Sequence, residues 1–388
     1  MYNFHTNLSS RTKKNTKDAS LTIIQEYVAK AQKRLKETKT YQVDAVIDGQ
    51  HITILTNDKH VAKFSKINWY QYGDKIPCTH GGKPTKKPAV MLYAVMGVPG
   101  MEPDAVYNAK THTAVFINTN YYGQIKSWAL GAIADLQEVK RHIHSIHGAC
   151  IVVGGNGYVV IAPTGTGKST VSMLMIKNIK GALVHSDDWV YLRYYPDHVL
   201  ACVSEKNFYI RTDGAGNFSW LKPILDKAPT ENVKDDKGRR EYAVFPNSRG
   251  LIQPKKLGKV TYHANVKAVF LLRRDDNSPA EVKLTPKQAV EVLQKGEYKV
   301  LPGAGSKELW GTFQYEPWYN PYLLVRTKKR RKMQVDSFMR LFKLADCYIF
   351  NTGVQKPTEV LERVKKIVSG EKREFVKKKG FLIPKEDA

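Results

Sequence analysis

Cysteine is scarce and scattered in this 388-residue chain. The four cysteines, Cys78, Cys150, Cys202 and Cys347, lie far apart, and none belongs to a Cys-x-x-Cys pair. Disulfide frameworks and structural zinc sites both need cysteines at short, paired spacings. We therefore expect neither, and a fold that depends on an ordinary hydrophobic core.

Long hydrophobic runs are also missing. No apolar stretch approaches the ~20 residues of a membrane-spanning helix. The first twenty residues, MYNFHTNLSSRTKKNTKDAS, are polar and basic, without the apolar segment of a secretory signal. We expect no membrane partner and a soluble, cytoplasmic protein.

Acidic residues are few beside basic ones. The chain has 36 Asp and Glu against 62 Lys and Arg, which gives a formal net charge of +26. Such an excess favours polyanionic partners, namely nucleic acid, acidic proteins or anionic surfaces, and solvated lysine faces are the alternative explanation. Hydrophobic residues make up 42% and charged residues 25%, so general disorder is excluded.

The length allows two domains, and the patterning predicts an α/β (α+β) protein with a mixed sheet. A helix capped by Ser20 should precede a hairpin around Asp48-Gly49, because the flanks of that dipeptide alternate apolar and polar residues. Short strands are expected at 61–64 and 89–95. The expected divisions are a basic arm over 1–19, a small α+β domain over 20–108, a catalytic domain over 109–370 and a frayed basic tail over 371–388.

The most informative stretch lies between the apolar run Tyr158–Ile161 and a helix-forming segment. Its glycines would let successive N–H groups point into one concavity, where a helix N-terminus adds its positive dipole end. Lys168 would reach the β- and γ-phosphates of a nucleotide, and the Ser169 hydroxyl would hold Mg²⁺. Ala162 replaces the glycine of the strict pattern. The predicted nucleotide-binding residues are Ala162, Pro163, Thr164, Gly165, Thr166, Gly167, Lys168, Ser169 and Thr170.

Two adjacent aspartates, Asp187 and Asp188, end the next apolar run. One carboxylate can approach Mg²⁺ while its neighbour accepts a proton from an incoming hydroxyl group, which is typical of kinases. The sequence does not say which aspartate takes which role. Two aspartates in a solvated turn are the alternative explanation.

Several short elements together resemble the HPr kinase / phosphoenolpyruvate carboxykinase superfamily. They are Ser145–Ala149, the predicted phosphate loop Ala162–Ser169, Leu183–Asp188, Tyr121–Lys126 (similar to the carboxykinase YAGEMK stretch), Asn247–Leu251 (similar to the HPr kinase ExRGLG signature) and Asn351–Gly353 (similar to a carboxykinase NTG element). The resemblance implies a P-loop kinase domain with a mixed sheet, which uses ATP with Mg²⁺ or Mn²⁺.

The resemblance also implies roles by matching position. The catalytic residues would be Lys168, Asp187, Asp188, His147 beside the metal or γ-phosphate, and Arg249 as an electrostatic clamp that Arg239 or Arg240 would share. The metal ligands would be Ser169, Asp188 and Glu205. Glu205 would replace the signature's glutamate, which is Asn247 here. Lys126 matches the first of two carboxykinase lysines, but Ser127 replaces the second, which weakens the case for oxaloacetate binding.

These inferences predict an ATP-dependent kinase that phosphorylates a hydroxyl group of a protein or small molecule. A DNA or RNA acceptor is one alternative, suggested by the charge of +26 and by the aromatic residues of 310–322 beside the basic cluster 328–332. An ATP-dependent phosphoenolpyruvate carboxykinase and a nucleotide-gated binder without transfer are two others. A homo-oligomer is compatible with the sequence.

Overall fold

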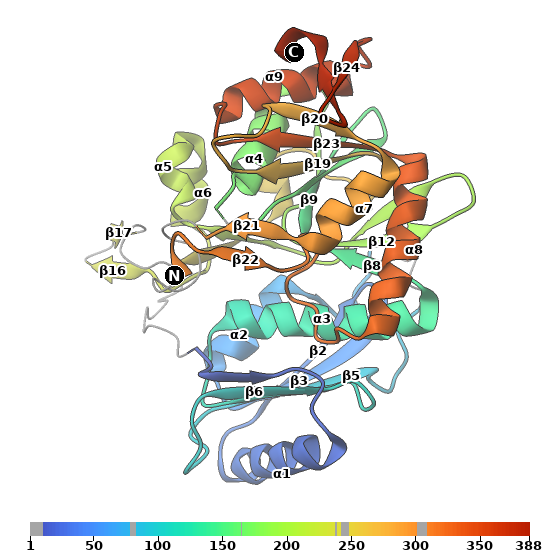
Figure 1. Cartoon of the computed structure of the whole chain (residues 1–388). Coiled ribbons are helices and arrows are strands. Elements are labelled where there is room, and N and C mark those ends of the chain that lie inside the picture. Colours follow the sequence, from blue (N-terminus) through green and yellow to red (C-terminus); the bar gives the residue numbers. More distant parts are fainter. Residues whose placement is uncertain (1–10, 78–82, 164, 237–238, 242–247, 301–308) are drawn as a thin grey trace. The chain divides into compact units, whose positions relative to one another are not determined.

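The computed structural model describes residues 11–77, 83–163, 165–236, 239–241, 248–300 and 309–388 (Figure 1). The chain divides into two compact units, each assembled from three separate segments. Unit 1 comprises residues 1–142, 204–256 and 322–327, and unit 2 comprises 143–203, 257–321 and 328–388. Both units combine helices with β-sheet, and the largest sheet of each mixes parallel and antiparallel pairs, so the α/β class is confirmed.

A seven-stranded sheet forms the centre of unit 1, in the order β1-β6-β7-β5-β3-β2-β4. Its strands are β1 (Lys14–Thr16), β2 (Tyr41–Ile47), β3 (Gln50–Thr56), β4 (Tyr70–Gln71), β5 (Val90–Val95), β6 (Asp104–Asn108) and β7 (Thr113–Ile117). The helices of this region are α1 (Leu21–Glu37), α2 (Lys59–Asn68) and α3 (Tyr122–Arg141).

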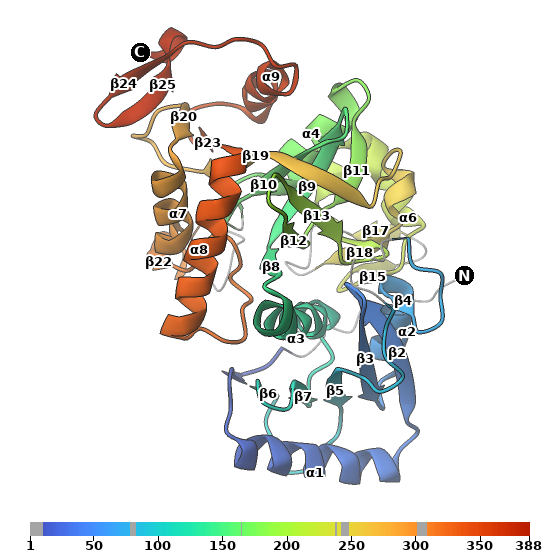
Figure 2. The same cartoon turned by 90° about the vertical axis from the view of Figure 1, so that its right-hand side faces the viewer.

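Helices α1 and α3 cover opposite faces of this sheet (Figure 2). The alternation of side chains along β7 explains the arrangement. Val115 and Ile117 pack in the same cluster as α1, whereas the ring of Phe116 lies 5.1 Å from that of Trp128 on α3. Residues 109–142, expected in the catalytic domain, therefore complete the N-terminal sheet.

Two local predictions are confirmed. The Ser20 hydroxyl accepts a hydrogen bond from the N–H of Ile23 and caps α1. Strands β2 and β3 form the expected hairpin, in which Asp48 and Gly49 have φ angles of 47° and 74°. Positive φ at both turn residues is the requirement of a type I′ turn.

Two other local predictions are wrong. Residues 61–64 are not a strand but part of α2, because the Asp58 carboxylate accepts hydrogen bonds from the N–H groups of His60 and Val61 and so starts a helix. The segment Lys14–Thr16, expected in a mobile arm, pairs as β1 with β6.

The remainder of unit 1 comes from residues 204–256. A small antiparallel sheet contains β14 (Phe208–Arg211), β18 (Arg249–Ile252) and β15 (Thr230–Glu231). The other elements are α5 (Gly214–Asn217), η1 (Ser219–Leu221), α6 (Lys222–Asp226), the hairpin β16 (Lys234–Asp236) and β17 (Arg239–Glu241), and η2 (Pro254–Lys256).

Unit 2 is organised on an eleven-stranded sheet with the main order β11-β9-β10-β19-β23-β20-β25-β24, to which β12, β13 and β8 are added. Its strands are β8 (His144–Ile146), β9 (Gly148–Val153), β10 (Asn156–Ile161), β11 (Leu183–Ser186), β12 (Val190–Tyr194), β13 (Val199–Val203), β19 (His263–Arg273), β20 (Glu281–Leu284), β23 (Asp346–Asn351), β24 (Phe375–Lys378) and β25 (Phe381–Pro384). A separate hairpin joins β21 (Glu297–Lys299) to β22 (Phe313–Tyr315).

The helices of unit 2 are α4 (Lys168–Asn178), α7 (Pro286–Lys295), α8 (Lys328–Leu344) and α9 (Pro357–Val368), and η4 (Lys385–Asp387) ends the chain. Helices α4 and α9 pack through Val171, Met175, Val360 and Val364 into one cluster with the central strands. Helices α7 and α8 lie side by side (Figure 1). Thr285 caps α7 through the reciprocal box with Gln288 that the sequence predicts.

The segment expected to be a frayed tail is ordered. Residues 375–384 form the hairpin β24–β25, and Leu382 pairs with Lys283 of β20. The carboxylate of Glu281 is fully buried and is neutralised by Arg373 at 2.8 Å and by Arg363 at 3.3 Å. A buried carboxylate needs such partners, so the basic residues serve the fold.

None of the helices in the described ranges combines the length and the apolar character that crossing a membrane requires.

Candidate phosphate-binding site

The site lies at one edge of the large sheet of unit 2. Strands β10, β19 and β23 are parallel neighbours, with Ile161 beside Leu271 and Arg273 beside Asn351. Strand β11 has the same direction, because both it and β10 are antiparallel to β9. The carboxyl ends of four strands therefore meet at this edge, which is where α/β sheets usually bind ligands.

The phosphate loop turns from β10 into α4 at this edge. Gly165 and Gly167 have φ angles of 87° and 102°, which side-chain-bearing residues rarely adopt. Gly167 is the N-cap of α4, and its carbonyl accepts the N–H of Val171 at 2.9 Å. Thr164 lies outside the described residues. The helix N-terminus thus begins directly at Lys168, with Ser169 and Thr170 half-buried in its first turn.

A turn at the end of β23 holds the loop. The Thr352 hydroxyl donates to the carbonyl oxygens of Thr166 at 3.0 Å and Arg273 at 3.1 Å. The Asn351 side-chain amide donates to the carbonyl of Asp275 at 2.9 Å, and its oxygen accepts the N–H of Asp275 at 3.1 Å. The NTG element that the sequence singles out therefore connects the phosphate loop to the end of β19.

Lys168, Asp188 and His147 meet beside the loop. The Lys168 ammonium group donates to Asp188 Oδ1 at 2.9 Å and to the main-chain carbonyl of Asp187 at 2.8 Å. His147 Nε2 lies 2.9 Å from the same Asp188 oxygen. The Asp188 side chain is 24% exposed, so its carboxylate is in contact with solvent as well as with Lys168 and His147.

The two aspartates differ in their surroundings. Asp187 is buried, and its main-chain carbonyl faces Lys168. The N–H of Gly148 donates to the main-chain carbonyl of Asp188 at 3.1 Å and holds the backbone there. The N–H of the preceding residue, His147, donates to the main-chain carbonyl of Tyr319 at 2.6 Å. Asp188 is therefore the better placed of the pair to meet a ligand on the loop.

The donors suit a hard cation shared with phosphate. Among the described residues, no group of three or more His, Cys, Asp or Glu side chains is arranged to hold a metal ion. The Asp188 carboxylate contacts Lys168 at 2.9 Å, and Ser169, the next residue of α4, carries a hydroxyl group. Mg²⁺ prefers oxygen ligands and commonly takes most of them from phosphate and water, so these residues fit Mg²⁺ better than a soft metal.

A buried histidine precedes the aspartates. Burial lowers the pKa of His185 to about 4, and the hydrogen bond to the Ala201 carbonyl at 3.1 Å opposes that shift only in part. Its other ring nitrogen lies 3.1 Å from the Ser186 hydroxyl. His185 is therefore a neutral, buried residue of β11 at physiological pH.

Glu205 belongs to unit 1, where it is buried. Its carboxylate accepts hydrogen bonds from Lys126 at 2.8 Å and from the Asn68 amide at 3.3 Å. Nearby, the carboxylate of Glu231 accepts the N–H groups of Tyr122 and Gly123, each at 3.2 Å, at the N-terminus of α3. The carboxykinase-like stretch thus lies in a buried, charge-neutralised part of unit 1.

Arg249 also belongs to unit 1. It begins β18, opposite Arg211 of β14, and its guanidinium donates to the Ser248 carbonyl at 2.9 Å. Arg239 and Arg240 lie in β17. Asn247 lies outside the described residues.

Sequence reasoning missed the residues at the end of β19. Arg273, Arg274 and Asp275 line a pocket together with Pro163 and Thr166 of the phosphate loop. Burial raises the pKa of Asp275, but the N–H of Ser278 and the charge of Arg273 outweigh it, so the pKa lies below its ordinary value. A signal was present, since the apolar run 266–272 ends directly in Arg-Arg-Asp-Asp.

The aromatic residues of 310–322 divide into two sets. Trp318 and Tyr319 are buried, as core residues are. Trp310, Phe313 and Tyr315 are 37%, 57% and 64% exposed, and the last two lie two residues apart on β22. Exposed aromatic rings of this kind offer stacking surfaces.

Comparison with solved structures finds similar chains, one of which is a kinase/phosphatase. It is the Hpr(Ser) kinase/phosphatase from Coxiella burnetii, with 12% sequence identity and a TM-score of 0.27 over 58% of this chain and 99% of that chain. No family model matches the sequence. No curated protein matches it either.

Proposed function

We propose that this protein is a Mg²⁺-dependent kinase of the HPr kinase / phosphoenolpyruvate carboxykinase type, which transfers the γ-phosphate of ATP to a hydroxyl group. The observation that carries the proposal is the position of Lys168. Lys168 is the first residue of α4, and its ammonium group contacts Asp188 at 2.9 Å. A phosphate-binding lysine and a carboxylate are thus adjacent, as phosphoryl transfer requires.

The step follows from these positions. The acceptor oxygen attacks the γ-phosphorus in line, and the bond from that phosphorus to the β,γ-bridging oxygen breaks, which releases ADP. The acceptor proton passes to the Asp188 carboxylate, which His147 orients. The Lys168 ammonium group and the N–H groups that open α4 stabilise the charge on the phosphate oxygens.

The proposed metal contact is the Ser169 hydroxyl, and a metal-binding role for Asp188 is the alternative to its role as the base. Mg²⁺, or Mn²⁺ in its place, would neutralise charge on the β- and γ-phosphates when bound. Glu205 and Arg249 remain predictions as metal ligand and electrostatic clamp. A kinase is favoured over a carboxykinase, because Lys126 is buried in an ion pair with Glu205 and Ser127 donates to the Gly123 carbonyl at 2.8 Å.

ATP turnover by two variants tests the proposal. Lys168→Ala should abolish nucleotide binding, because it removes the cation that faces the phosphates. Asp188→Asn should retain binding, but turnover should fall roughly 10²- to 10⁴-fold with loss of the base. Loss of Mg²⁺-dependent binding in Asp188→Asn would instead assign that carboxylate to the metal.

Two matched variants control for the change in charge. Lys180→Ala removes an exposed lysine two residues after the end of α4, and Asp197→Asn alters a carboxylate that is 84% exposed. Both should behave as wild type. The proposal is wrong if Lys168→Ala and Asp188→Asn also keep wild-type turnover.

A further inference from the structure

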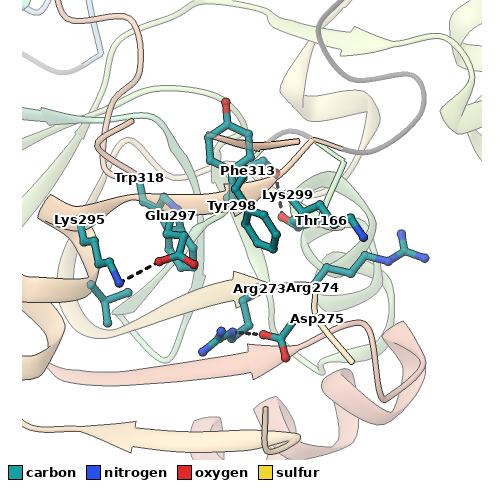
Figure 3. A pocket seen from close by; sticks show the side chains of 12 residues that line it. Thr166, Arg273, Arg274, Asp275, Lys295, Glu297, Tyr298, Lys299, Phe313 and Trp318 are labelled. Atoms are coloured by element: carbon teal, nitrogen blue, oxygen red, sulfur yellow. Dashed lines mark hydrogen bonds and ion pairs between the residues drawn. The ribbon is translucent and has the colours of Figure 1, made fainter. Parts of the chain in front are cut away.

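A pocket of about 190 Å³ adjoins the phosphate loop within unit 2. Pro163 and Thr166 of the loop form one wall, and the end of β19 forms another. The hairpin β21–β22 and Trp318 complete the lining. Figure 3 shows Tyr298 and Phe313 of the hairpin across the pocket from Arg273 and Asp275.

The position and size of the pocket limit what it can hold. Because it shares Thr166 with the phosphate loop, a ligand whose phosphates bind the loop can extend into it. Pockets that enclose a whole drug-sized ligand usually measure roughly 300–1,000 Å³. This smaller pocket suits one part of a nucleotide, namely the base with its sugar.

The walls favour a flat aromatic ligand. Phe313 is 57% exposed although it lines the pocket, so a large part of its ring is open to a ligand. Arg273 and Arg274 lie opposite the hairpin (Figure 3). Nucleobases stack on aromatic rings and on guanidinium planes.

The acidic groups in the lining already have partners. Asp275 pairs with Arg273 at 2.5 Å and accepts the N–H of Ser278 at 2.6 Å. Glu297 pairs with Lys295 at 2.8 Å. Base-specific recognition needs polar groups that face the edge of the base. These carboxylates instead form ion pairs with neighbouring side chains of the protein.

We propose that this pocket is the nucleoside-binding part of the site and that it holds the base by stacking, without strong selection among bases. The inference rests on the proposed function, and it deepens it by naming the donor class. ATP and GTP would both serve as donors, with Phe313 as the main stacking residue.

Binding titrations with MgCl₂ and three ligands, namely ATP, GTP and inorganic tripolyphosphate, test the inference. Wild-type protein should bind ATP and GTP within about tenfold of one another, since stacking tolerates any base. Tripolyphosphate should bind roughly 5- to 150-fold more weakly, which is the usual range of one stacking contact. Phe313→Ala should weaken ATP and GTP binding toward the level of tripolyphosphate and leave tripolyphosphate binding unchanged.

Tyr315→Ala is the matched control. Tyr315 lies on the same strand and is 64% exposed, but it does not line the pocket. This variant should bind all three ligands as wild type does. Since Phe313 is itself exposed, circular dichroism should show both variants folded.

The outcomes separate this inference from the proposed function. Unchanged ATP binding by Phe313→Ala, with tripolyphosphate still bound, would overturn the assignment of the pocket and leave the phosphate site intact. A preference of more than about 100-fold for one nucleotide would overturn the claim of weak selection. If wild-type protein bound neither ATP nor tripolyphosphate, the proposed function would fail, and this inference with it.

Discussion

One carboxylate oxygen of Asp188 contacts both a lysine and a histidine. Lys168 and His147 each lie 2.9 Å from Oδ1. A partly buried carboxylate beside a lysine is stable because each charge offsets the cost of removing the other from water. An arriving triphosphate would compete with Asp188 for the lysine, which would leave the carboxylate oriented by His147 and available for a proton.

His185 predicts how the stability of unit 2 depends on pH. Its pKa of about 4 in the folded state lies below the ordinary 6.5, so between these values the unfolded chain binds a proton that the folded chain does not. The free energy of unfolding should therefore fall as pH decreases from 6.5 to 4, by about 3 kcal/mol. Urea unfolding at several pH values measures the slope.

Two variants isolate this contribution. His185→Gln keeps a donor for the Ala201 carbonyl but cannot titrate, so the slope between pH 6.5 and 4 should flatten. His198→Gln removes an exposed histidine from the β12–β13 turn and should leave the slope as it is. An unchanged slope in His185→Gln would show that another group is responsible.

At the scale of elements, the turn after β23 fixes the geometry of the site. A Cβ atom on Gly353 would lie 2.4 Å from the Asp275 carbonyl oxygen, which is too close for any side chain. Gly353→Ala should therefore displace the end of β19 and lower the free energy of unfolding by about 1–3 kcal/mol. Nucleotide affinity should fall too, because Asp275 and Thr166 both depend on this turn.

A second glycine provides the comparison. A Cβ atom on Gly216 of α5 would meet nothing within 4 Å. Gly216→Ala should leave the free energy of unfolding unchanged or raise it by roughly a few tenths of a kcal/mol, since alanine only restricts the conformations of the unfolded chain. Thermal and chemical unfolding compare the two variants. Equal stability of Gly353→Ala and wild type would contradict the proposed role of the turn.

Features set by neighbouring residues were predictable from the sequence. The Asp48-Gly49 hairpin and the Ser20 and Thr285 caps depend on contacts within a few positions. The prediction of a strand at 61–64 is wrong for a reason on the same scale, because the Asp58 cap starts a helix there. The pocket was not predictable, since its lining comes from segments more than a hundred residues apart.

At the scale of the whole molecule, the two units are built from interleaved segments. Residues 204–256 lie between β13 and β19 of unit 2 in the sequence. They nevertheless belong to unit 1, together with the N-terminal sheet. The sequence predicts a boundary at 108, but β7 pairs with β5 and α3 packs against β7 through Trp128, so the first segment of unit 1 extends to 142. Which distant segments join one unit depends on contacts between residues far apart in the sequence, and local sequence patterns do not specify those contacts.

The net charge of +26 bears on which acceptor the protein phosphorylates, because an excess of basic residues favours polyanionic partners. The basic residues have several roles, since Arg363 and Arg373 neutralise a buried glutamate. The rings of Trp310 and Tyr315 are exposed and could stack with bases, so a DNA or RNA acceptor stays a prediction. A protein or small-molecule acceptor needs no such surface.

The most direct measurement is transfer of label from γ-labelled ATP into a cell extract that is then fractionated into protein, nucleic acid and small molecules. We expect wild-type protein and Asp197→Asn to label one fraction, Lys168→Ala to label none, and Asp188→Asn to label it roughly 10²- to 10⁴-fold more slowly. The proposed kinase activity would be contradicted if no fraction were labelled, or if Lys168→Ala labelled it as fast as wild type.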